Sequence, residues 1–222
     1  MDLNFSSVWQ YWPFLYNGAL LTLKMTAICA VLGFALGVLL SLIKLSKFRP
    51  LVWFGQFYTS IFRGTPLLVQ LCIVHFGLPQ LLGMPLSTTQ SGILTFSLNS
   101  AAYISEIFRG GIQAIDKGQY EAAMSLGIGY RDMMKDIIIP QAVKHILPSL
   151  VNEMIALLKE SSILSYIGAV ELLRAADQIT VMTYRFFEPY LVVAVIYYVM
   201  VMILSLFAAK LERWVNRSDR VS

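Results

Sequence analysis

The sequence predicts an all-α membrane protein, and composition, hydropathy and charge placement all point to that class. Of the 222 residues, 57% are apolar and 14% are charged, whereas soluble domains carry roughly 45–50% apolar and about 25% charged residues. A water-soluble surface is difficult to build from so few charges. The apolar residues fall into five runs of about the length that a helix needs to cross the hydrocarbon core. We therefore expect residues 1–222 to form a single transmembrane domain.

The five runs predict five membrane-spanning helices. The first, Leu20–Ile43, contains Lys24 as its only charged residue, and the last, Pro189–Ala209, contains none. Gly33 and Gly37 stand four residues apart in the first run, a spacing that permits close packing of two helices. The expected spans are residues 20–43, 66–82, 92–107, 148–170 and 189–209.

The positions of the basic residues predict the orientation of these spans. Thirteen of the 17 Lys and Arg residues lie between the first and second spans, between the third and fourth spans, or after the fifth span. Segments rich in Lys and Arg stay on the cytoplasmic side of the membrane. We therefore expect the N-terminus outside the cell and the C-terminus in the cytoplasm, in agreement with an odd number of spans.

A proline interrupts the chain at the start of the second expected span. A helical stretch over Val52–Phe62 is followed by Arg63, Gly64, Thr65 and Pro66. Proline lacks an amide hydrogen and disfavours helical geometry in the residue before it. The segment is either a cytoplasmic elbow at the membrane surface or a helix broken within the membrane, which is tolerated only where the backbone lines protein or a water-filled cavity. These four residues are candidates for a gating element or helix break.

Residues 113–145 form a long cytoplasmic loop between the third and fourth spans. Asp116 followed by Gln119 resembles a capping box at a helix start, and Gly127–Gly129 ends the helix expected there. A second short helix is expected over Tyr130–Ile139. The result is a compact knob that either docks into a groove of a partner or packs on the bundle. Its exposed residues are expected to be Met124, Leu126, Ile128, Tyr130, Met133 and Met134.

The sequence contains no signature of catalysis or of a metal site. It lacks the Gly-x4-Gly-Lys-Ser/Thr loop that holds the phosphates of ATP. His75 and His145 lie far apart and have no cysteine neighbours in sequence that would complete a zinc site. We therefore expect no bound metal and no enzymatic activity, and no nucleic acid as a partner, because the net charge of +4 reflects topology.

The long loop carries a motif. Glu121-Ala122-Ala123 is followed after three intervening residues by Gly127 and, after nine further intervening residues, by Ile137 with Ile139-Pro140 beyond it. This spacing resembles the EAA loop of ABC importer permeases, with Ile139 in place of the usual leucine. Three further segments resemble the polar amino-acid branch of that family, in which Asp or Asn is usual at the position of Glu160. They are Phe62–Pro66, Glu106–Ile112 and Lys159–Ser162.

The resemblance implies an ABC type I importer permease in the bacterial cytoplasmic (inner) membrane. Its function would be the import of polar amino acids, including basic ones such as arginine, lysine or histidine, by alternating access. Glu121, Ala122 and Ala123 would dock into a cleft of an ATP-binding cassette ATPase dimer, and Gly127 would form the corner of the loop. ATP and Mg would be bound by that ATPase, with no cofactor on this chain. The other partners would be a second permease subunit, identical or related, and an extracytoplasmic substrate-binding protein.

A polar amino acid needs acceptors for its ammonium and donors for its carboxylate. Asn99 offers both, and Ser161 and Ser162 offer hydroxyl donors. Ionisable groups within spans are costly and default to functional candidates, so Glu153 is the candidate for a second positive charge on the substrate. The alternative for Glu153 is a pair with a neighbouring helix, such as with Arg63, or with a second copy of the chain.

One helix face, one ion pair and one alternative function complete the expectations. Asn99, Tyr103 and Glu106 share one face of the third span by their spacing, and Glu106 should pair with Arg109 three residues later. The alternative function is an ion-coupled secondary transporter of amino acids. That class typically contains inverted repeats with matching broken helices, and no internal repeat is visible in this sequence.

Overall fold

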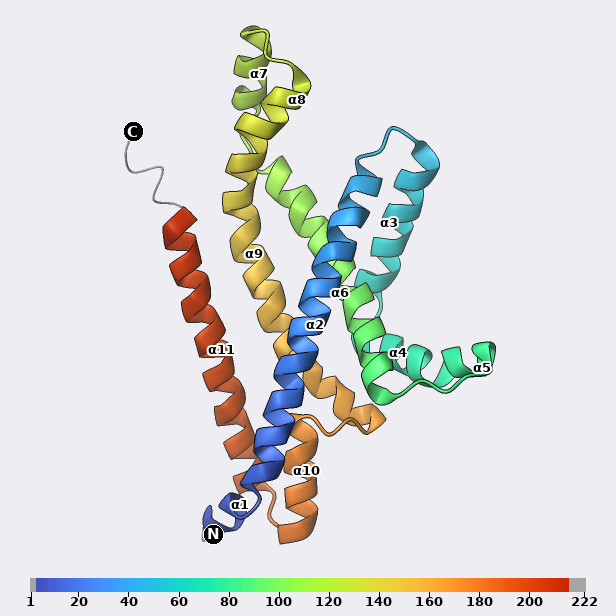
Figure 1. Cartoon of the computed structure of the whole chain (residues 1–222), viewed down its shortest axis with the longest axis vertical. Helices are drawn as coiled ribbons and strands as arrows, with labels where there is room; N and C mark the ends of the chain where they lie inside the picture. The colour runs from blue at the N-terminus through green and yellow to red at the C-terminus, as the bar shows by residue number, and fades with distance from the viewer. Residues whose placement is uncertain (1–2, 216–222) are drawn as a thin grey trace.

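The computed structural model describes residues 3–215, and every regular element in that range is a helix. Four long helices run along the molecule, with α7 and α8 at one end and α1 and α10 at the other (Figure 1). The elements are α1 (Ser6–Trp9), α2 (Trp12–Lys44), α3 (Arg49–Gly64), α4 (Leu67–Cys72), a π-helical turn (Ile73–Gly77), α5 (Leu78–Leu82), α6 (Thr88–Gln113), α7 (Lys117–Ser125), α8 (Tyr130–Asp132), a second π-helical segment (Met133–Ile138), α9 (Ile139–Glu160), a 3₁₀ helix (Ser161–Ile167), α10 (Leu172–Thr183) and α11 (Phe187–Val215).

Two helices, α2 and α11, are individually long and apolar enough to cross a membrane, with mean hydropathies of 2.5 and 2.7 in their most apolar windows. A further pair, Arg49–Gly64 with Leu67–Leu82, passes the same test only when taken together, and it is bent by 105°. Residues 66–82 therefore do not qualify as a span by themselves, and they do not continue α3 in a straight line. The chain instead turns at Thr65 and Pro66, whose backbone is extended.

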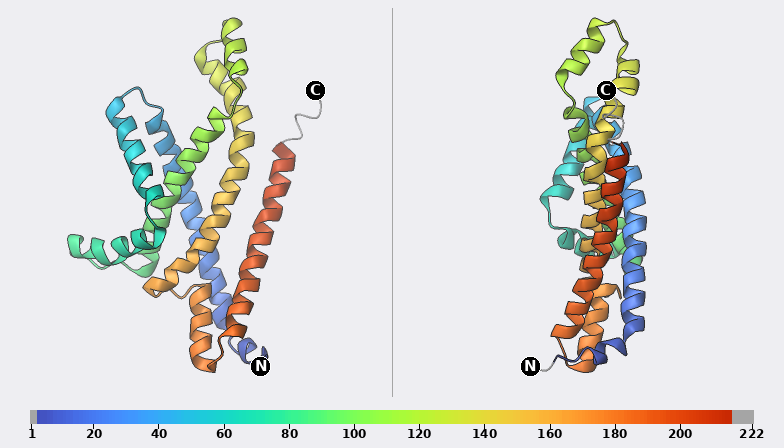
Figure 2. Two further views of the ribbon diagram at one scale, coloured as in Figure 1. Left: turned by 180° about the vertical axis from the view of Figure 1, so that it is seen from behind. Right: turned by 90° about the vertical axis from the view of Figure 1, so that its left-hand side faces the viewer.

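The bend lies within the bundle. Helix α3 packs along α2 and α6, whereas α4 and α5 project sideways from the bundle in views from both sides (Figures 1 and 2). An elbow lying flat on the membrane surface does not fit a helix packed along two others. The broken-helix alternative fits this arrangement, and Arg63 to Pro66 stand at the break.

Helix α9 corrects two expectations. It begins at Ile139 and continues through Pro148 to Glu160, so the fourth long helix does not start at Pro148. The second short helix expected over residues 130–139 is also wrong as a separate element, since α8 and the π-helical segment lead directly into α9. Pro140 occupies one of the first two positions of α9, where the second π-helical segment joins it, so this proline does not end the helix as expected.

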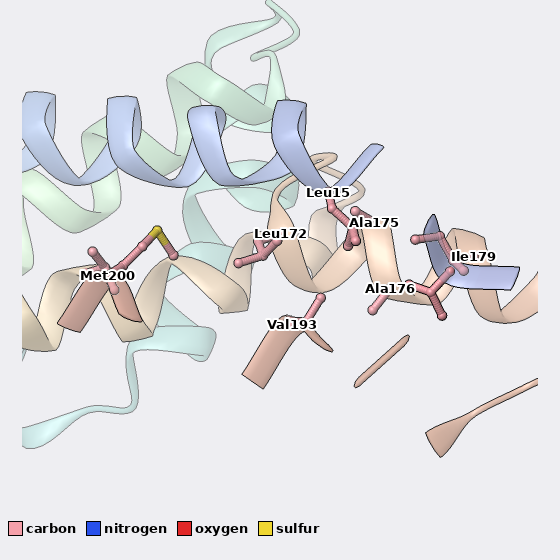
Figure 3. Packing of buried hydrophobic residues seen from close by; sticks show 9 residues of the cluster. Leu15, Leu172, Ala175, Ala176, Ile179, Val193 and Met200 are labelled. Atoms are coloured by element: carbon pink, nitrogen blue, oxygen red, sulfur yellow. The ribbon is translucent and has the colours of Figure 1, made fainter. Parts of the chain in front are cut away.

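The end of the bundle at α1 and α10 is held by a buried core. Leucine, isoleucine and alanine side chains of α2 and α10 pack there against a valine and a methionine of α11 (Figure 3). Glu171 caps α10 within this core and accepts hydrogen bonds from the amides of Leu173 and Arg174 and from the hydroxyl of Tyr197. Burial raises the pKa of the Glu171 carboxyl, because desolvation outweighs these hydrogen bonds to its charged form. The labelled members of the cluster are Leu15, Leu172, Ala175, Ala176, Ile179, Val193 and Met200.

The predicted close packing at Gly33 and Gly37 is confirmed. Both glycines are buried on α2 against α6. A β-carbon on Gly33 would lie 2.8 Å from Cβ of Ser100, and one on Gly37 would lie 2.7 Å from Cβ of Ile104. Contacts under 3.0 Å do not occur between real side chains, so α2 and α6 approach this closely only because both positions are glycine.

We expect Gly37→Ala to destabilise the protein by about 1–3 kcal/mol, the usual cost of overpacking a filled site. Gly110→Ala on α6 is the matched control, because no atom lies within 4 Å of its added β-carbon and alanine favours a helix by about 1 kcal/mol over glycine. Thermal unfolding of the purified protein in detergent measures both changes. Equal unfolding temperatures for the two variants would contradict the packing argument.

Candidate functional site

The break between α3 and α4 is closed by two side-chain amides. Gln70 Nε2 donates to the carbonyl oxygens of Phe62 at 2.9 Å and Thr65 at 3.1 Å, and to Thr65 Oγ1 at 2.9 Å. Asn99 Nδ2 on α6 donates to the same Phe62 carbonyl at 3.2 Å and to Gln70 Oε1 at 3.0 Å. These bonds satisfy carbonyls that lose their helical partners at the break. The side-chain nitrogen of Asn99, which was predicted to bind substrate, therefore stabilises the helix break in this structure.

Glu153 lies at a groove between α2, α6 and α9. Its Oε1 accepts a hydrogen bond from Ser100 Oγ of α6 at 2.8 Å. The groove has a volume of about 420 Å³ and is otherwise apolar, with lining residues that include Ala30, Phe34 and Met154. A carboxylate at the wall of an apolar groove offers a cationic ligand a partner that water screens poorly.

The hydroxyls of the two predicted serine ligands donate hydrogen bonds to carbonyls three residues earlier in the chain. Ser161 is buried and its hydroxyl donates to the Leu158 carbonyl at 2.7 Å, while the Ser162 hydroxyl donates to the Lys159 carbonyl at 2.8 Å. Neither hydroxyl shares a hydrogen bond with Glu153 among the described residues. The four predicted ligands therefore lie in three surroundings: Asn99 at the helix break, Glu153 at the groove, and the serines in the 3₁₀ turn after α9.

The residues that the spacing placed on one face of α6 lie where α6 meets α3. Asn99 bonds to the end of α3, and the guanidinium of Arg63 lies 5.5 Å from the centre of the Tyr103 ring. Glu106 pairs with Arg109 at 2.6 Å, which confirms the expected local ion pair. The carboxylate that Arg63 approaches is also Glu106, at 3.5 Å, so the suggested pair between Arg63 and Glu153 is wrong.

Sequence reasoning missed a further member of this cluster. Lys44, at the end of α2, donates to Glu106 Oε1 at 2.6 Å and to Ser105 Oγ at 3.0 Å. Three basic residues from α2, α3 and α6 thus surround one carboxylate. The sequence indicates only the orientation of the spans at Lys44. Its contact with Glu106 is not predictable from periodicity, because the two residues stand 62 positions apart. The available clue was a lone acidic residue in an apolar span flanked by basic segments.

The knob at the far end of α6 forms from the sequence as expected. Asp116 caps α7 by accepting from the amide of Gly118. The helix ends at Gly127, whose φ of +73° is disfavoured for residues with a β-carbon. Glu121 and Ala122 are exposed, but Ala123 is buried against the rest of the knob, so two of the three predicted docking residues face outward. Met124, Leu126 and Tyr130 are also exposed.

The expected exposure of Met133 is wrong. Met133 packs with Ala123, Ile138 and Ala142 in the core of the knob. The reason is the continuous connection from α8 into α9, which turns this side chain toward α7. The outward surface of the knob therefore consists of α7, the corner after it and α8.

The chain resembles known proteins over almost its whole length. It is 49% identical to the arginine transport system permease protein ArtQ of Bacillus subtilis, over 99% of this chain and 100% of that protein. It is 48% identical to the putative glutamine transport system permease protein GlnP of Rickettsia felis, over 90% of this chain and 92% of the relative.

Solved structures share this fold. One chain, from a crystal structure of an amino acid ABC transporter with histidines, superposes with a TM-score of 0.92 at 44% identity and covers 96% of this chain and 99% of its own length. A chain of the MetNI methionine ABC transporter in inward-facing form gives a TM-score of 0.74 at 21% identity, over 92% of this chain and 97% of its own. The latter supports the fold alone.

The family described as "binding-protein-dependent transport system inner membrane component" matches residues 31–217. That range includes the helix break, the groove with Glu153 and the whole knob. The chain belongs to this family of ABC importer permeases, within which its named relatives are amino-acid permeases.

Proposed function

We propose that the chain is the permease subunit of an ATP-driven ABC importer that moves polar amino acids, basic ones in particular, into the cytoplasm. The observation that carries the proposal is the knob formed by α7 and its glycine corner. It stands outside the helix bundle (Figure 1) and exposes Glu121, Ala122 and Met124. A docking surface of this kind is what a permease needs when ATP is hydrolysed on another subunit.

The proposed topology has five membrane crossings, with the N-terminus outside and the C-terminus in the cytoplasm. Its supports are the apolar α2 and α11 and the bent pair of α3 with α4–α5. Basic residues gather at the end of the bundle that carries α7, including Lys44, Lys47 and Arg49 in and beside the turn between α2 and α3. By the positive-inside rule that end faces the cytoplasm.

The preference for a basic substrate rests on Glu153. Its carboxylate stands at the wall of an apolar groove and has one neutral hydrogen-bond donor, Ser100, bonded to it among the described residues. An ammonium or guanidinium would compensate that charge. Asn99, Ser161 and Ser162 remain proposed contacts for the α-amino and α-carboxyl groups, which would require their present local hydrogen bonds to rearrange.

Transport would proceed by alternating access in an assembly of two permeases and two ATPases. ATP and Mg would be bound by the ATPase pair, whose closure would draw the two knobs together and tilt the bundles. An extracytoplasmic binding protein would deliver the amino acid. A second permease, identical or related, is supported by the large exposed apolar surface of α11, of which only 11% of the most apolar window is buried.

Reconstituted vesicles test this function. The chain, its ATPase and its binding protein are placed in proteoliposomes, and uptake of radiolabelled arginine and glutamine is measured with ATP inside. We expect uptake to require both ATP and the binding protein and to persist when an ionophore collapses ion gradients. Uptake that survives ATP depletion and stops with the ionophore would instead establish the ion-coupled secondary transporter.

A further inference from the structure

A polar cavity separates α3 from the ends of α2 and α6. Its volume is about 520 Å³, and four of its lining side chains are uncharged groups that can donate hydrogen bonds. It lies apart from the groove that contains Glu153, which is lined by a different set of residues. The lining residues are Lys44, Gln56, Thr59, Ser60, Arg63, Glu106, Arg109 and Gln113.

The charges of this cavity do not balance. Lys44, Arg63 and Arg109 bring three positive charges, and Glu106 brings the one negative charge of the lining. Lys44 is nearly buried, with 8% of its side chain exposed, and it forms a close pair with Glu106 at 2.6 Å. Glu106 also pairs with Arg109 at 2.6 Å, so one carboxylate serves three cations and the lining keeps an excess of positive charge.

The two arginines keep donors for a ligand. A guanidinium carries five N–H groups, and Arg63 reaches Glu106 only at 3.5 Å, beyond ordinary hydrogen-bond distance. Arg109 spends its Nε and Nη2 on Glu106 and its Nη1 on Gln113 Oε1 at 2.8 Å. The side chains of Arg63 and Arg109 remain 46% and 50% exposed, so an incoming group can reach both.

Both arginines are held in place before any ligand arrives. The guanidinium of Arg63 stacks over Tyr103, a cation–π contact that favours one orientation. Arg109 is fixed by the carboxylate one turn earlier and the amide one turn later on α6. Two preorganised guanidiniums beside hydroxyl and amide groups match the geometry of a phosphate, which accepts paired N–H bonds from arginine.

We propose that this cavity is a binding site for a phosphate oxyanion, supplied by the headgroup of an anionic phospholipid or by free inorganic phosphate. The position favours the lipid. Lys44 ends α2 and Gln113 ends α6, at the end of the bundle whose basic residues place it toward the cytoplasm. Basic cavities between membrane helices on that side bind the headgroups of anionic lipids. Only the assignment of leaflet rests on the proposed topology.

Lipid binding to the purified permease–ATPase complex tests the site. The complex is titrated with phosphatidylglycerol or phosphatidylcholine, and bound lipid is counted by native mass spectrometry. Both headgroups carry a phosphate, but the choline of phosphatidylcholine adds a positive charge that the excess positive charge of the lining repels. We therefore expect at least about tenfold tighter binding of phosphatidylglycerol. The double variant Arg63→Gln, Arg109→Gln should lose that preference.

The control variant removes the same charge elsewhere. Lys47→Gln with Arg49→Gln deletes two exposed positive charges at the same end of the bundle, outside the cavity. We expect it to retain the preference for phosphatidylglycerol within about twofold, since long-range charge is screened. Equal losses in the two double variants would overturn the proposal. If the double glutamine variant does not assemble with the ATPase, the variant Arg63→Lys with Arg109→Lys replaces it. This variant keeps both charges but loses the paired N–H groups, so its preference for phosphatidylglycerol must be weaker than that of the wild type but still present.

A second titration distinguishes the sources of phosphate. Inorganic phosphate is added to the wild type and to the variant Arg63→Gln, Arg109→Gln, and the unfolding temperature of each is measured. If phosphate stabilises only the wild type and no lipid selectivity is seen, the site is supported with free phosphate as its ligand. If the wild type shows neither a preference for phosphatidylglycerol nor stabilisation by inorganic phosphate, the proposal is overturned. Competitive displacement of phosphatidylglycerol by arginine or glutamine also overturns it, because the cavity would then belong to the path of the amino acid.

Discussion

Replacement of Gly127 by valine is expected to uncouple ATP hydrolysis from transport. The residue turns the chain at the end of α7 with a φ of +73°, a conformation that a β-branched residue adopts only with severe strain. Strain of this kind costs about 1–3 kcal/mol, so either the corner rearranges or α7 loses its position. Uptake and substrate-stimulated ATPase activity in proteoliposomes should fall by about tenfold or more.

Gly129 provides the matched control for this change. It lies two residues further on in the same corner, has a φ of −62°, and an added β-carbon would lie no closer than 3.8 Å to its neighbour Asp132. Gly129→Ala should therefore retain transport. Glu121→Lys tests the contact surface itself, because it reverses an exposed charge without strain, and it should weaken copurification of the ATPase. Normal coupling in both Gly127→Val and Glu121→Lys would exclude the knob as the docking element.

Replacement of Glu153 by glutamine is expected to change the choice of substrate more than the rate of transport in general. Glutamine keeps the size and the hydrogen bond with Ser100 but removes the charge. Loss of a charged partner costs about 1.5–3 kcal/mol, which corresponds to roughly ten- to hundredfold weaker handling of arginine. Uptake of glutamine should change little, so competition between the two labelled amino acids measures the effect directly.

Glu160→Gln makes the same chemical change on the same helix, two turns away and outside the groove lining. It should leave the ratio of arginine to glutamine uptake unaltered. Ser100→Ala removes the hydroxyl that holds the Glu153 carboxylate and should reduce the ratio partially. If Glu153→Gln lowers the uptake of arginine and of glutamine equally, the carboxylate has a structural role and the argument for basic substrates is lost.

The sequence was sufficient for the all-helical class and for the local features of the chain. The Gly33 and Gly37 contact, the start of α7 at Asp116 and the pair of Glu106 with Arg109 all depend on residues a few positions apart, and all three are found. Apolar runs also located the long helices approximately. Their ends differed because a proline does not always end a helix: Pro140 lies where the second π-helical segment joins α9, and Pro148 lies inside α9.

The rest depended on distant parts of the chain. The contact of Lys44 with Glu106 and that of Asn99 with Phe62 join residues that no periodicity connects. The direction in which Asn99 points follows from the bend at Thr65, and the bend itself was left open between two alternatives. A site assembled from side chains on several helices can be predicted as a set of candidates, but its partners follow only from packing.

The hydrogen bonds at the break between α3 and α4 have a consequence for how the protein is made. The side-chain oxygen of Gln70 accepts its hydrogen bond from Asn99, which is synthesised 29 residues later. An unpaired amide oxygen in hydrocarbon costs several kcal/mol, so the half of the molecule that emerges first cannot reach its final shape alone. Membrane insertion of α3 to α5 is thus completed only when α6 arrives. Truncated chains that stop before Asn99 should accordingly be recognised by the cell as unfinished.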